Sequence, residues 1–267
     1  MIEFTDIHKY DTGRRSSKGN QFKFRLDDRW YKADYLGYEG LAEYVVSELL
    51  ALSSLDDSEY TRYGLEQIKY KNVVFNGCVS KDFAGPWNLI TLERLFKNVY
   101  GQSLNRIIFT IDDHTERLKT MVDLVERATS IKGFGIYMNK MLTIDAIFLN
   151  EDRHTNNIAI MTNGTEYRLA PIFDNGAALL SDTRMDYPLT DDTYSLINDV
   201  KPKTFCDSFT EQLEISESLY GHNIRFEYGY NEVEAIINKA TIYDEQIRKR
   251  VIDVIMETRR RYSYLFG

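Results

Sequence analysis

Three side chains suited to phosphate chemistry lie close together in the sequence. Asp152 and Asn157 belong to the polar stretch LNEDRHTNN, and Asp174 follows in the stretch APIFDNG. Carboxylate and amide oxygens are ligands that Mg²⁺ takes in proteins, and a carboxylate can also accept a proton from an attacking hydroxyl group. These residue types indicate a site that holds Mg²⁺ with a nucleotide and transfers a phosphoryl group.

A short β-hairpin between the two stretches should bring two of these side chains together. The apolar runs Ile158–Met161 and Tyr167–Phe173 flank an Asn-Gly pair, which is a strong local signal for a hairpin turn. Because a hairpin returns the chain to where it started, Asn157 and Asp174 are expected to lie side by side. We expect these two residues to be the metal ligands.

The spacing within the first stretch is that of a catalytic loop. Asp152 precedes Asn157 by five residues, as the catalytic Asp precedes the metal-binding Asn in protein kinases. Asp152 is therefore the candidate general base. His154 is assigned a supporting catalytic role, because no Ser, Cys or metal partner accompanies it, and Arg153 stays unassigned. The alternative is that these polar residues only cap and pair within a loop.

A small, polar loop near the N-terminus could cover the nucleotide phosphates. The segment Gly13–Gly19, GRRSSKG, has residues typical of loops whose backbone N–H groups bind phosphate. An ordinary exposed turn has the same composition. The candidate nucleotide-binding residues of this loop are Ser16, Ser17, Lys18 and Gly19.

Lys32 and Glu43 occupy the positions of a strand lysine and a helix glutamate. Lys32 lies in the otherwise apolar run Trp30–Ala33, and Glu43 lies in a stretch of helical apolar spacing that begins at Gly40. Protein kinases use such a pair at the nucleotide phosphates, so both are candidate catalytic residues and Lys32 is also a candidate nucleotide ligand. The alternative is a solvated lysine and a surface glutamate.

The elements that position these residues suggest two lobes separated near the Gly85-Pro86 step. Before this step, the apolar pattern predicts a hairpin over 22–33, a helix over 41–52 and a strand over 72–79. After it, helices are predicted near 88–99, 113–130, 136–149, 207–220, 231–240 and 244–264. We expect an α+β, bilobal protein-kinase-like fold, with a small β-rich N-lobe over residues 1–84 and a larger, mainly helical C-lobe over residues 85–267.

The composition of the 267-residue chain limits its location and partners. A formal net charge of −8 argues against a broad nucleic-acid surface, which needs clustered Lys and Arg. Cys78 and Cys206 indicate neither a disulfide framework nor a zinc site, because no CxxC or Cys/His pattern accompanies them. No window approaches the roughly 20 apolar residues of a membrane span, and no signal-peptide stretch is present. We expect a cytoplasmic protein without direct nucleic-acid binding.

With these residues in view, the sequence resembles the HipA-type serine/threonine kinases, the toxin kinases of bacterial persistence modules. Their catalytic loop runs Asn-x-Asp-x-His-x-x-Asn, matched here by Asn150, Asp152, His154 and Asn157. Their metal-binding Asp lies in a Pro-x-x-Asp stretch after a hairpin, matched by Pro171 and Asp174. The Asp-Arg-His order of the loop is also similar to that of phosphatidylinositol kinases.

The resemblance implies ATP and Mg²⁺ as cofactors, a protein hydroxyl group of Ser or Thr as the acceptor, and an antitoxin or regulatory subunit as a candidate partner. A lipid or small-molecule kinase stays open as an alternative. An alternative of another class is a nucleotide-binding pseudokinase that acts as an interaction module. The intact set of Lys32, Glu43, Asp152, Asn157 and Asp174 argues against the pseudokinase.

The resemblance also implies self-inhibition through the phosphate loop. HipA-type kinases silence themselves through a serine in this region, so Ser16 and Ser17 are expected sites of autophosphorylation. A phosphoserine would add nearly two negative charges where the loop approaches ATP; the alternative is two ordinary turn serines. Full-length members carry a further N-terminal subdomain, and this sequence begins almost directly at the loop, so it is expected to correspond to the kinase core.

Overall fold

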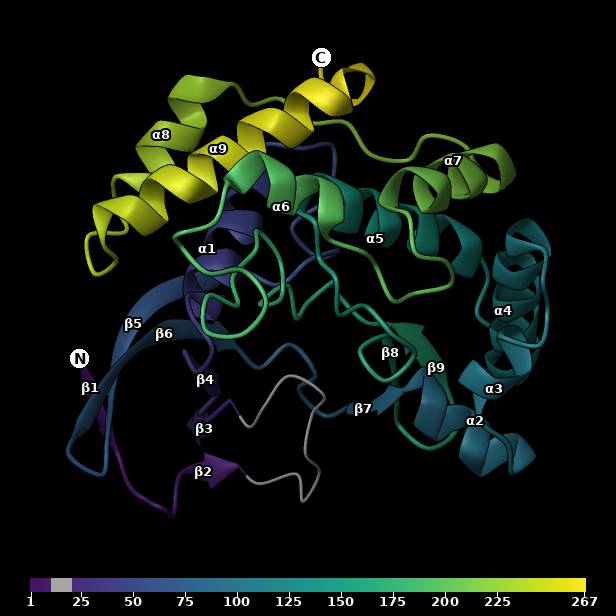
Figure 1. The fold of residues 1–267 in the computed structure, drawn as a ribbon. Coiled ribbons are helices and arrows are strands. Elements are labelled where there is room, and N and C mark those ends of the chain that lie inside the picture. Colours follow the sequence, from purple (N-terminus) through teal and green to yellow (C-terminus); the bar gives the residue numbers. More distant parts are fainter. Residues whose placement is uncertain (11–20) are drawn as a thin grey trace. The chain divides into compact units, whose positions relative to one another are not determined.

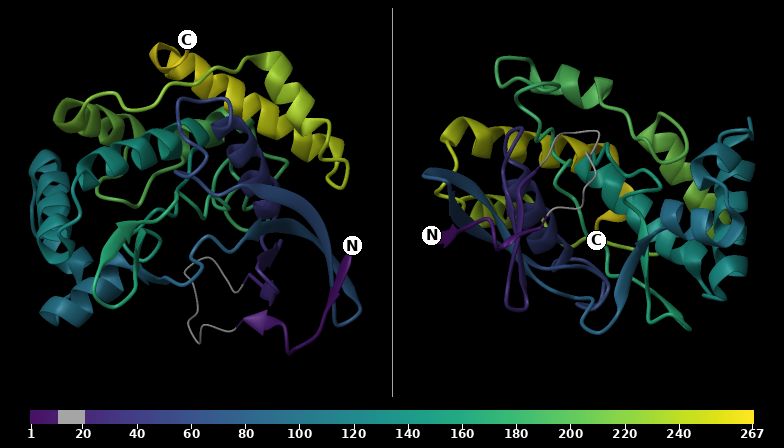
Figure 2. Two further views of the ribbon diagram at one scale, coloured as in Figure 1. Left: turned by 180° about the vertical axis from the view of Figure 1, so that it is seen from behind. Right: turned by 90° about the horizontal axis from the view of Figure 1, so that it is seen from below.

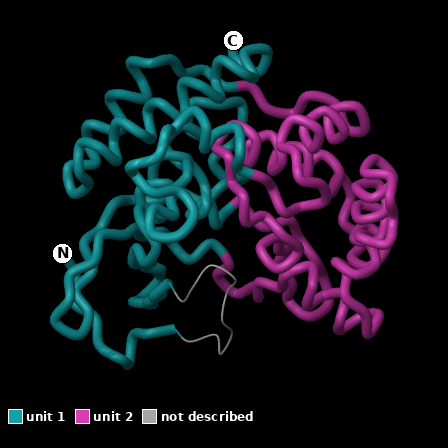
Figure 3. The backbone as a smooth tube through the Cα atoms, in the orientation of Figure 1, with its two compact units in different colours: residues 1–83, 173–200, 226–267 teal, residues 84–172, 201–225 magenta. Residues whose placement is uncertain are grey.

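The structure is a computed structural model that describes residues 1–10 and 21–267. The chain forms two compact units, which Figure 3 shows in different colours. The first unit combines residues 1–83, 173–200 and 226–267, and the second combines residues 84–172 and 201–225. Each unit combines ranges from both sides of the Gly85-Pro86 step or from separate parts of the chain. The lobes over residues 1–84 and 85–267 therefore stay a prediction.

A mostly antiparallel sheet, six-stranded over the described residues, forms the β-rich part of the first unit (Figure 1). Its strands, in order across the sheet, are β1 (Ile2–Phe4), β5 (Tyr63–Tyr70), β6 (Val73–Lys81), β4 (Arg29–Ala33), β3 (Lys23–Leu26) and β2 (Lys9–Tyr10). β1 pairs with β5 in parallel. The turn between β5 and β6 has positive φ at both Lys71 and Asn72, which gives a twist that matches the paired strands.

Aromatic side chains pack together on one face of this sheet and determine to which face each side chain of β4 points. Phe4 stacks on Phe24 with ring centroids 4.7 Å apart, and Tyr31 and Ala33 of β4 belong to the same buried cluster. Successive side chains of a strand point to opposite faces. Lys32, between Tyr31 and Ala33, therefore points to the other face of the sheet.

Helices complete the first unit. α1 (Glu39–Leu50) packs against β4, β5 and β6, and the curved ribbon of β5 and β6 passes alongside it in the views of Figures 1 and 2. Almost the whole length of α1 is buried. The other helical segments of this unit are α6 (Thr193–Asp199), α8 (Tyr230–Ile237), α9 (Glu245–Arg261) and the 3₁₀ turn η1 (Ser263–Leu265).

The second unit is mainly helical and is built around the buried helix α5 (Phe134–Phe148). α4 (His114–Thr129) and α7 (Phe209–Tyr220) both pack against α5. A small antiparallel sheet joins β7 (Asn88–Thr91), β8 (Ala159–Thr162) and β9 (Tyr167–Leu169). Two helices follow β7 along the chain, α2 (Leu92–Tyr100) and α3 (Leu104–Ile108).

The α+β fold class is confirmed, as are most of the predicted elements. The two predicted hairpins, one on each side of the Gly85-Pro86 step, are formed by β3 with β4 and by β8 with β9. The predicted helices that occur close to their expected positions are α1, α4, α5, α7, α8 and α9. The helix predicted over 88–99 is wrong at its start, because Asn88–Thr91 pairs with β8 as a strand. No element was predicted from the sequence at β1, β2, β5, α3 or α6. Among the described residues, none of the helices combines the length and apolarity needed to cross a bilayer.

Candidate active site

A buried ammonium group between two carboxylates is the centre of the candidate site in the first unit. Lys32 of β4 binds Glu43 Oε1 through Nζ, and the same nitrogen lies 2.7 Å from Asp174 Oδ1. Burial alone would lower the pKa of Lys32, but Asp174 and Glu43 outweigh it, so this pKa is raised well above its ordinary value. Lys32 is therefore a permanent cation in the folded protein at neutral pH.

Glu43 of α1 connects this cation to the segment that contains Asp174. Its side chain is fully buried, and while Oε1 binds Lys32, Oε2 accepts a hydrogen bond of 2.8 Å from the backbone N–H of Asn175. Burial raises the pKa of Glu43, opposed by the charge of Lys32 and reinforced by that of Asp174. One glutamate thus fixes both the lysine and the backbone beside Asp174.

Asp174 adopts an uncommon backbone conformation and keeps contact with solvent. Its φ of 62° lies in the left-handed region, where non-glycine residues are infrequent and often functional. Its side chain is 27% exposed, compared with 10% for Lys32 and 0% for Glu43. Of the three charged groups, Asp174 is therefore the one a ligand can reach most readily.

Two glycines allow α1 to approach the sheet closely enough for Glu43 to reach Lys32. A Cβ atom on Gly40 would lie 2.6 Å from the backbone of Gly77 in β6, and a Cβ atom on Gly77 would lie 2.1 Å from the carbonyl oxygen of Lys32. Gly40 precedes Glu43 by about one helical turn. The glycine contact therefore sets the distance between the helix and the strand at the ion pair.

Asp34 fastens the start of α1 to the strand that precedes it. Its Oδ1 accepts a hydrogen bond of 2.5 Å from the N–H of Gly40, and its Oδ2 accepts one of 2.8 Å from the hydroxyl of Tyr243. Burial, with the nearby charge of Glu39, raises the pKa of Asp34 to about 7. The sequence analysis missed Asp34, Gly40, Gly77 and Tyr243 as positioning residues, because their contacts exist only in the folded chain.

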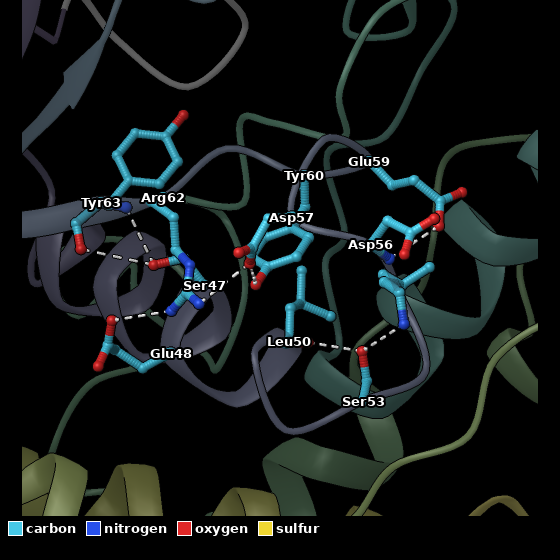
Figure 4. A network of polar contacts seen from close by, with 11 residues as sticks. Ser47, Glu48, Leu50, Ser53, Asp56, Asp57, Glu59, Tyr60, Arg62 and Tyr63 are labelled. Carbon is cyan, nitrogen blue, oxygen red and sulfur yellow. Dashed lines mark hydrogen bonds and ion pairs between the residues drawn. The ribbon is translucent and has the colours of Figure 1, made fainter.

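Near the other end of α1, Figure 4 shows exposed ion pairs together with buried hydrogen bonds between Ser47 and Tyr63. Arg62 approaches Glu48 at 3.5 Å and Asp57 at 3.2 Å, and the hydroxyl of Tyr60 donates to Asp57 at 2.9 Å. The side chains of Arg62 and Asp57 are 47% and 83% exposed. Such solvated pairs contribute little to stability. The exposed pairs of Arg62 therefore hold this end weakly, and the buried contact near it is the hydrogen bond of 3.1 Å from the N–H of Tyr63 to Ser47 Oγ.

The second unit contains a buried ion pair beneath the candidate catalytic loop. The guanidinium group of Arg153 makes hydrogen bonds of 3.1 and 3.2 Å to the carboxylate of Asp145, near the end of α5, and both side chains are almost completely buried. Asn150 donates to the same carboxylate at 3.0 Å. Burial raises the pKa of Asp145, with Arg153 and Asn150 opposing the shift. Arg153, unassigned from the sequence, is thus a positioning residue for the loop.

Asn157 and Asp152 are bound to each other within that loop. The side-chain nitrogen Nδ2 of Asn157 donates to the backbone oxygen of Asp152 at 2.7 Å and to its carboxylate at 3.0 Å. The N–H of Asn157 also donates to the carbonyl of His154 at 2.7 Å, which closes the loop. Because Nδ2 faces Asp152, the amide oxygen of Asn157 is the atom suited to a cation.

Two cationic or titratable side chains approach Asp152. His154 Nε2 and Lys203 Nζ each lie 3.7 Å from Asp152 Oδ1, and Lys203 also lies 3.9 Å from Glu151. The contact with His154 is compatible with a supporting role. Lys203 was not predicted from the sequence, because it lies in the segment between α6 and α7 and no local pattern relates it to the loop.

The structure does not test the predicted phosphate loop or the predicted pair of metal ligands. Ser16, Ser17, Lys18 and Gly19 lie outside the described residues. Asn157 belongs to the second unit and Asp174 to the first. Their predicted role as joint metal ligands therefore stays a prediction.

Comparison with solved structures identifies the fold. CtkA, a proinflammatory kinase of Helicobacter pylori, matches with a TM-score of 0.56 and 17% sequence identity over 97% of this chain and 95% of that chain. The chain thus has a kinase-like fold, as predicted. HipA of Shewanella oneidensis MR-1, from a toxin–antitoxin complex with HipB and operator DNA, gives a TM-score of 0.41 and 10% identity over 97% of this chain and 63% of that chain. No family model and no curated protein matches the sequence.

Proposed function

We propose that the protein is an ATP-dependent kinase that transfers the γ-phosphoryl group to a hydroxyl group, with Ser or Thr of a protein as the favoured acceptor. The observation that carries this proposal is the ammonium group of Lys32 held between Glu43 and Asp174. Well-packed apolar residues often stabilise a protein as much as a buried ion pair does, so stability alone does not explain this charge cluster. Charged groups with strongly shifted pKa values are frequent at functional sites, which favours a functional role for it. The kinase-like fold supports the proposal without carrying it.

In this proposal the first unit binds the nucleotide. Lys32 offers its ammonium group to phosphate oxygens, and Glu43 keeps that group in position. Asp174 offers a carboxylate oxygen to Mg²⁺, which suits its greater exposure. Bound Mg²⁺ and ATP would supply the transferable phosphoryl group and neutralise its negative charge.

The second unit acts on the acceptor. Asp152 orients the acceptor hydroxyl and takes its proton, while Asn157 holds Asp152 through Nδ2 and offers its amide oxygen to the metal. Arg153 fixes the loop through Asp145. Carboxylate and amide oxygens form a hard donor set, so these residues fit Mg²⁺ better than a softer metal.

Labelled ATP tests the function directly. Wild-type protein with Mg²⁺ should label a protein acceptor in host lysate, and Asp152→Ala should lower the rate by about 10² to 10⁴-fold while nucleotide affinity stays near the wild-type value. Asp123→Ala is the matched control, because Asp123 lies in an exposed pair with Arg127 on α4. Wild-type turnover in Asp152→Ala would remove Asp152 from its role.

The label also separates the alternative functions. Labelled lipid or a labelled soluble product would replace the protein acceptor with one of those classes. ATP binding without any labelled product would favour the pseudokinase. A cytoplasmic location remains a prediction from the composition of the sequence. An antitoxin or regulatory partner and autophosphorylation of Ser16 or Ser17 remain predictions from the resemblance.

A further inference from the structure

Three potential metal ligands from two helices and a connecting segment converge in the second unit. His114 begins α4, Cys206 lies shortly before α7, and Glu211 lies in the first turn of α7. The ligand atoms of these three side chains lie within 4.8 Å of one another, and His114 Nδ1 is 2.5 Å from Glu211 Oε1. The cluster is not part of the candidate active site.

Buried hydrogen bonds hold the backbone around this cluster. Arg117, one turn after His114, donates to the carbonyl oxygen of Phe205 and to that of Ile111. Gln212, next to Glu211, donates to the carbonyl oxygen of Cys206 at 2.8 Å. Arg117 and Gln212 are themselves buried. The start of α4 and the segment before α7 are thus tied together independently of the three ligands, which is the support that a metal site needs.

We propose that His114, Cys206 and Glu211 bind one Zn²⁺ ion, with water as the fourth ligand. Imidazole, thiolate and carboxylate are all ligands of Zn²⁺, and their bond lengths of about 2.0 to 2.3 Å place them about 3.3 to 3.8 Å apart around a tetrahedral ion. The contact of 2.5 Å between His114 and Glu211 would have to open, and both side chains are partly exposed, at 32% and 44%, which leaves them room to turn. The thiolate selects Zn²⁺ over Mg²⁺ or Ca²⁺, which prefer oxygen ligands.

The site differs from a simple ion pair through the buried thiol. Cys206 is 7% exposed, and its sulfur atom lies within 4.8 Å of the ligand atoms of His114 and Glu211. Cysteine binds Zn²⁺ as a thiolate, so ligation of Cys206 would release a proton into solvent. A contact between His114 and Glu211 alone would not involve the sulfur atom of Cys206, so a thiolate–metal signal distinguishes the two cases.

The proposed metal would lie close in sequence to Lys203, which contacts the candidate catalytic loop. Cys206 lies three residues after Lys203, whose ammonium group lies 3.7 Å from Asp152. Ligation of Cys206 would fix the backbone of the segment that carries Lys203. The sequence analysis indicated no zinc site, because His114, Cys206 and Glu211 have no close metal-ligand spacing.

Cobalt titration of the chelator-treated full chain tests the site. Co²⁺ should bind at one equivalent, with visible bands typical of a tetrahedral ion and a near-ultraviolet charge-transfer band from a thiolate. Zn²⁺ should then displace it. Cys206→Ser should remove the thiolate band, and His114→Gln or Glu211→Gln should each weaken Co²⁺ affinity at least about tenfold.

The chain offers matched controls for each ligand. Cys78→Ser removes the other cysteine and should leave the band unchanged. His222→Gln removes a second His–Glu pair, in which His222 Nδ1 lies 3.0 Å from Glu217, and should leave the affinity unchanged. Circular dichroism without metal checks that each variant is folded. For a variant that fails this check, Zn²⁺-dependent proton release from wild-type protein decides instead. A thiolate band that persists in Cys206→Ser, or absence of both cobalt binding and proton release in wild type, would overturn the proposal.

Discussion

Among residues 1–10 and 21–267, a buried ion pair in each unit can be compared, and the two are built in opposite ways. Asp145 and Arg153 are eight residues apart in sequence and are sealed from solvent, with side-chain exposures of 2% and 1%. Lys32 reaches Glu43 eleven residues away and Asp174 142 residues away, and Asp174 remains 27% exposed. The first pair is local and closed, whereas the second is assembled from distant segments and is open on one side.

The difference in exposure distinguishes residues that position other groups from residues that can bind a ligand. A sealed pair cannot meet a ligand, so Arg153 and Asp145 contribute by holding the loop that presents Asp152 and Asn157. A group that must bind phosphate or metal has to keep one side accessible, as Asp174 does. Exposure of one member of a buried charge cluster therefore marks the member expected to act.

The largest expected effect is loss of the sealed pair. Asp145→Ala leaves the guanidinium group of Arg153 buried without its carboxylate, so the free energy of unfolding should fall by about 3 to 5 kcal/mol. Urea denaturation measures this change. Asp123→Ala, which breaks the exposed pair with Arg127 on α4, should leave the unfolding midpoint nearly unchanged. Equal midpoints for the two variants would erase the distinction between sealed and open pairs.

The open pair should respond differently, because we assign it to nucleotide binding. Lys32→Met leaves Glu43 buried without its cation, so it should lower both stability and phosphoryl transfer. Adding Glu43→Gln removes the unpaired buried charge, while the carboxylate of Asp174 keeps contact with solvent, so the free energy of unfolding should return to within about 1 kcal/mol of wild type. Transfer of labelled phosphate should stay lost in the double variant. A double variant with wild-type turnover would reduce Lys32 and Glu43 to a structural pair.

The contrast between local contacts and contacts between distant segments explains which site residues could be predicted from the sequence. The loop from Asn150 to Asn157 is contiguous, so its spacing already indicated Asp152 and Asn157. Lys32 was singled out because it lies in an otherwise apolar strand, and Glu43 because it follows on the next helix. The structure adds that Tyr31 and Ala33 pack on the opposite face of β4. The bond of Glu43 to the backbone at Asn175 joins segments 132 residues apart, and no local pattern encodes it.

Errors in the predicted elements have a related cause. Asn88–Thr91 resembles the start of a helix in its local pattern and becomes a strand because β8 offers it a partner. β5 lies beside α1 and carries a mixed pattern of burial, so it lacks the strict alternation of a half-buried strand. Tertiary pairing overrides weak local preference at both places.

A smaller effect is expected where α1 meets the sheet. In Gly77→Ala the new Cβ atom would lie 2.1 Å from the carbonyl oxygen of Lys32, so β4 or β6 must shift, and a shift of β6 moves the Gly77 backbone against which Gly40 of α1 packs. Overpacking of this kind should lower the free energy of unfolding by about 1 to 3 kcal/mol and weaken ATP binding through displacement of Glu43. Gly64→Ala in β5 is the control, because its Cβ atom would meet only Val79, at 3.5 Å. Equal ATP affinity in both variants would show that the glycine contact does not position the ion pair.

The smallest effect is expected at the opposite end of the same helix. Arg62→Ala removes the contacts to Glu48 and Asp57 seen in Figure 4, but both ion pairs are solvated and Arg62 is 47% exposed. Water replaces the lost contacts at little cost, so the urea midpoint and ATP affinity should match those of wild type within error. The buried hydrogen bond of 3.1 Å from the N–H of Tyr63 to Ser47 Oγ remains in this variant and keeps β5 attached to α1. A fall in ATP affinity as large as that of Gly77→Ala would mean that both ends of α1 control the position of Glu43, and that the first turns have no special role.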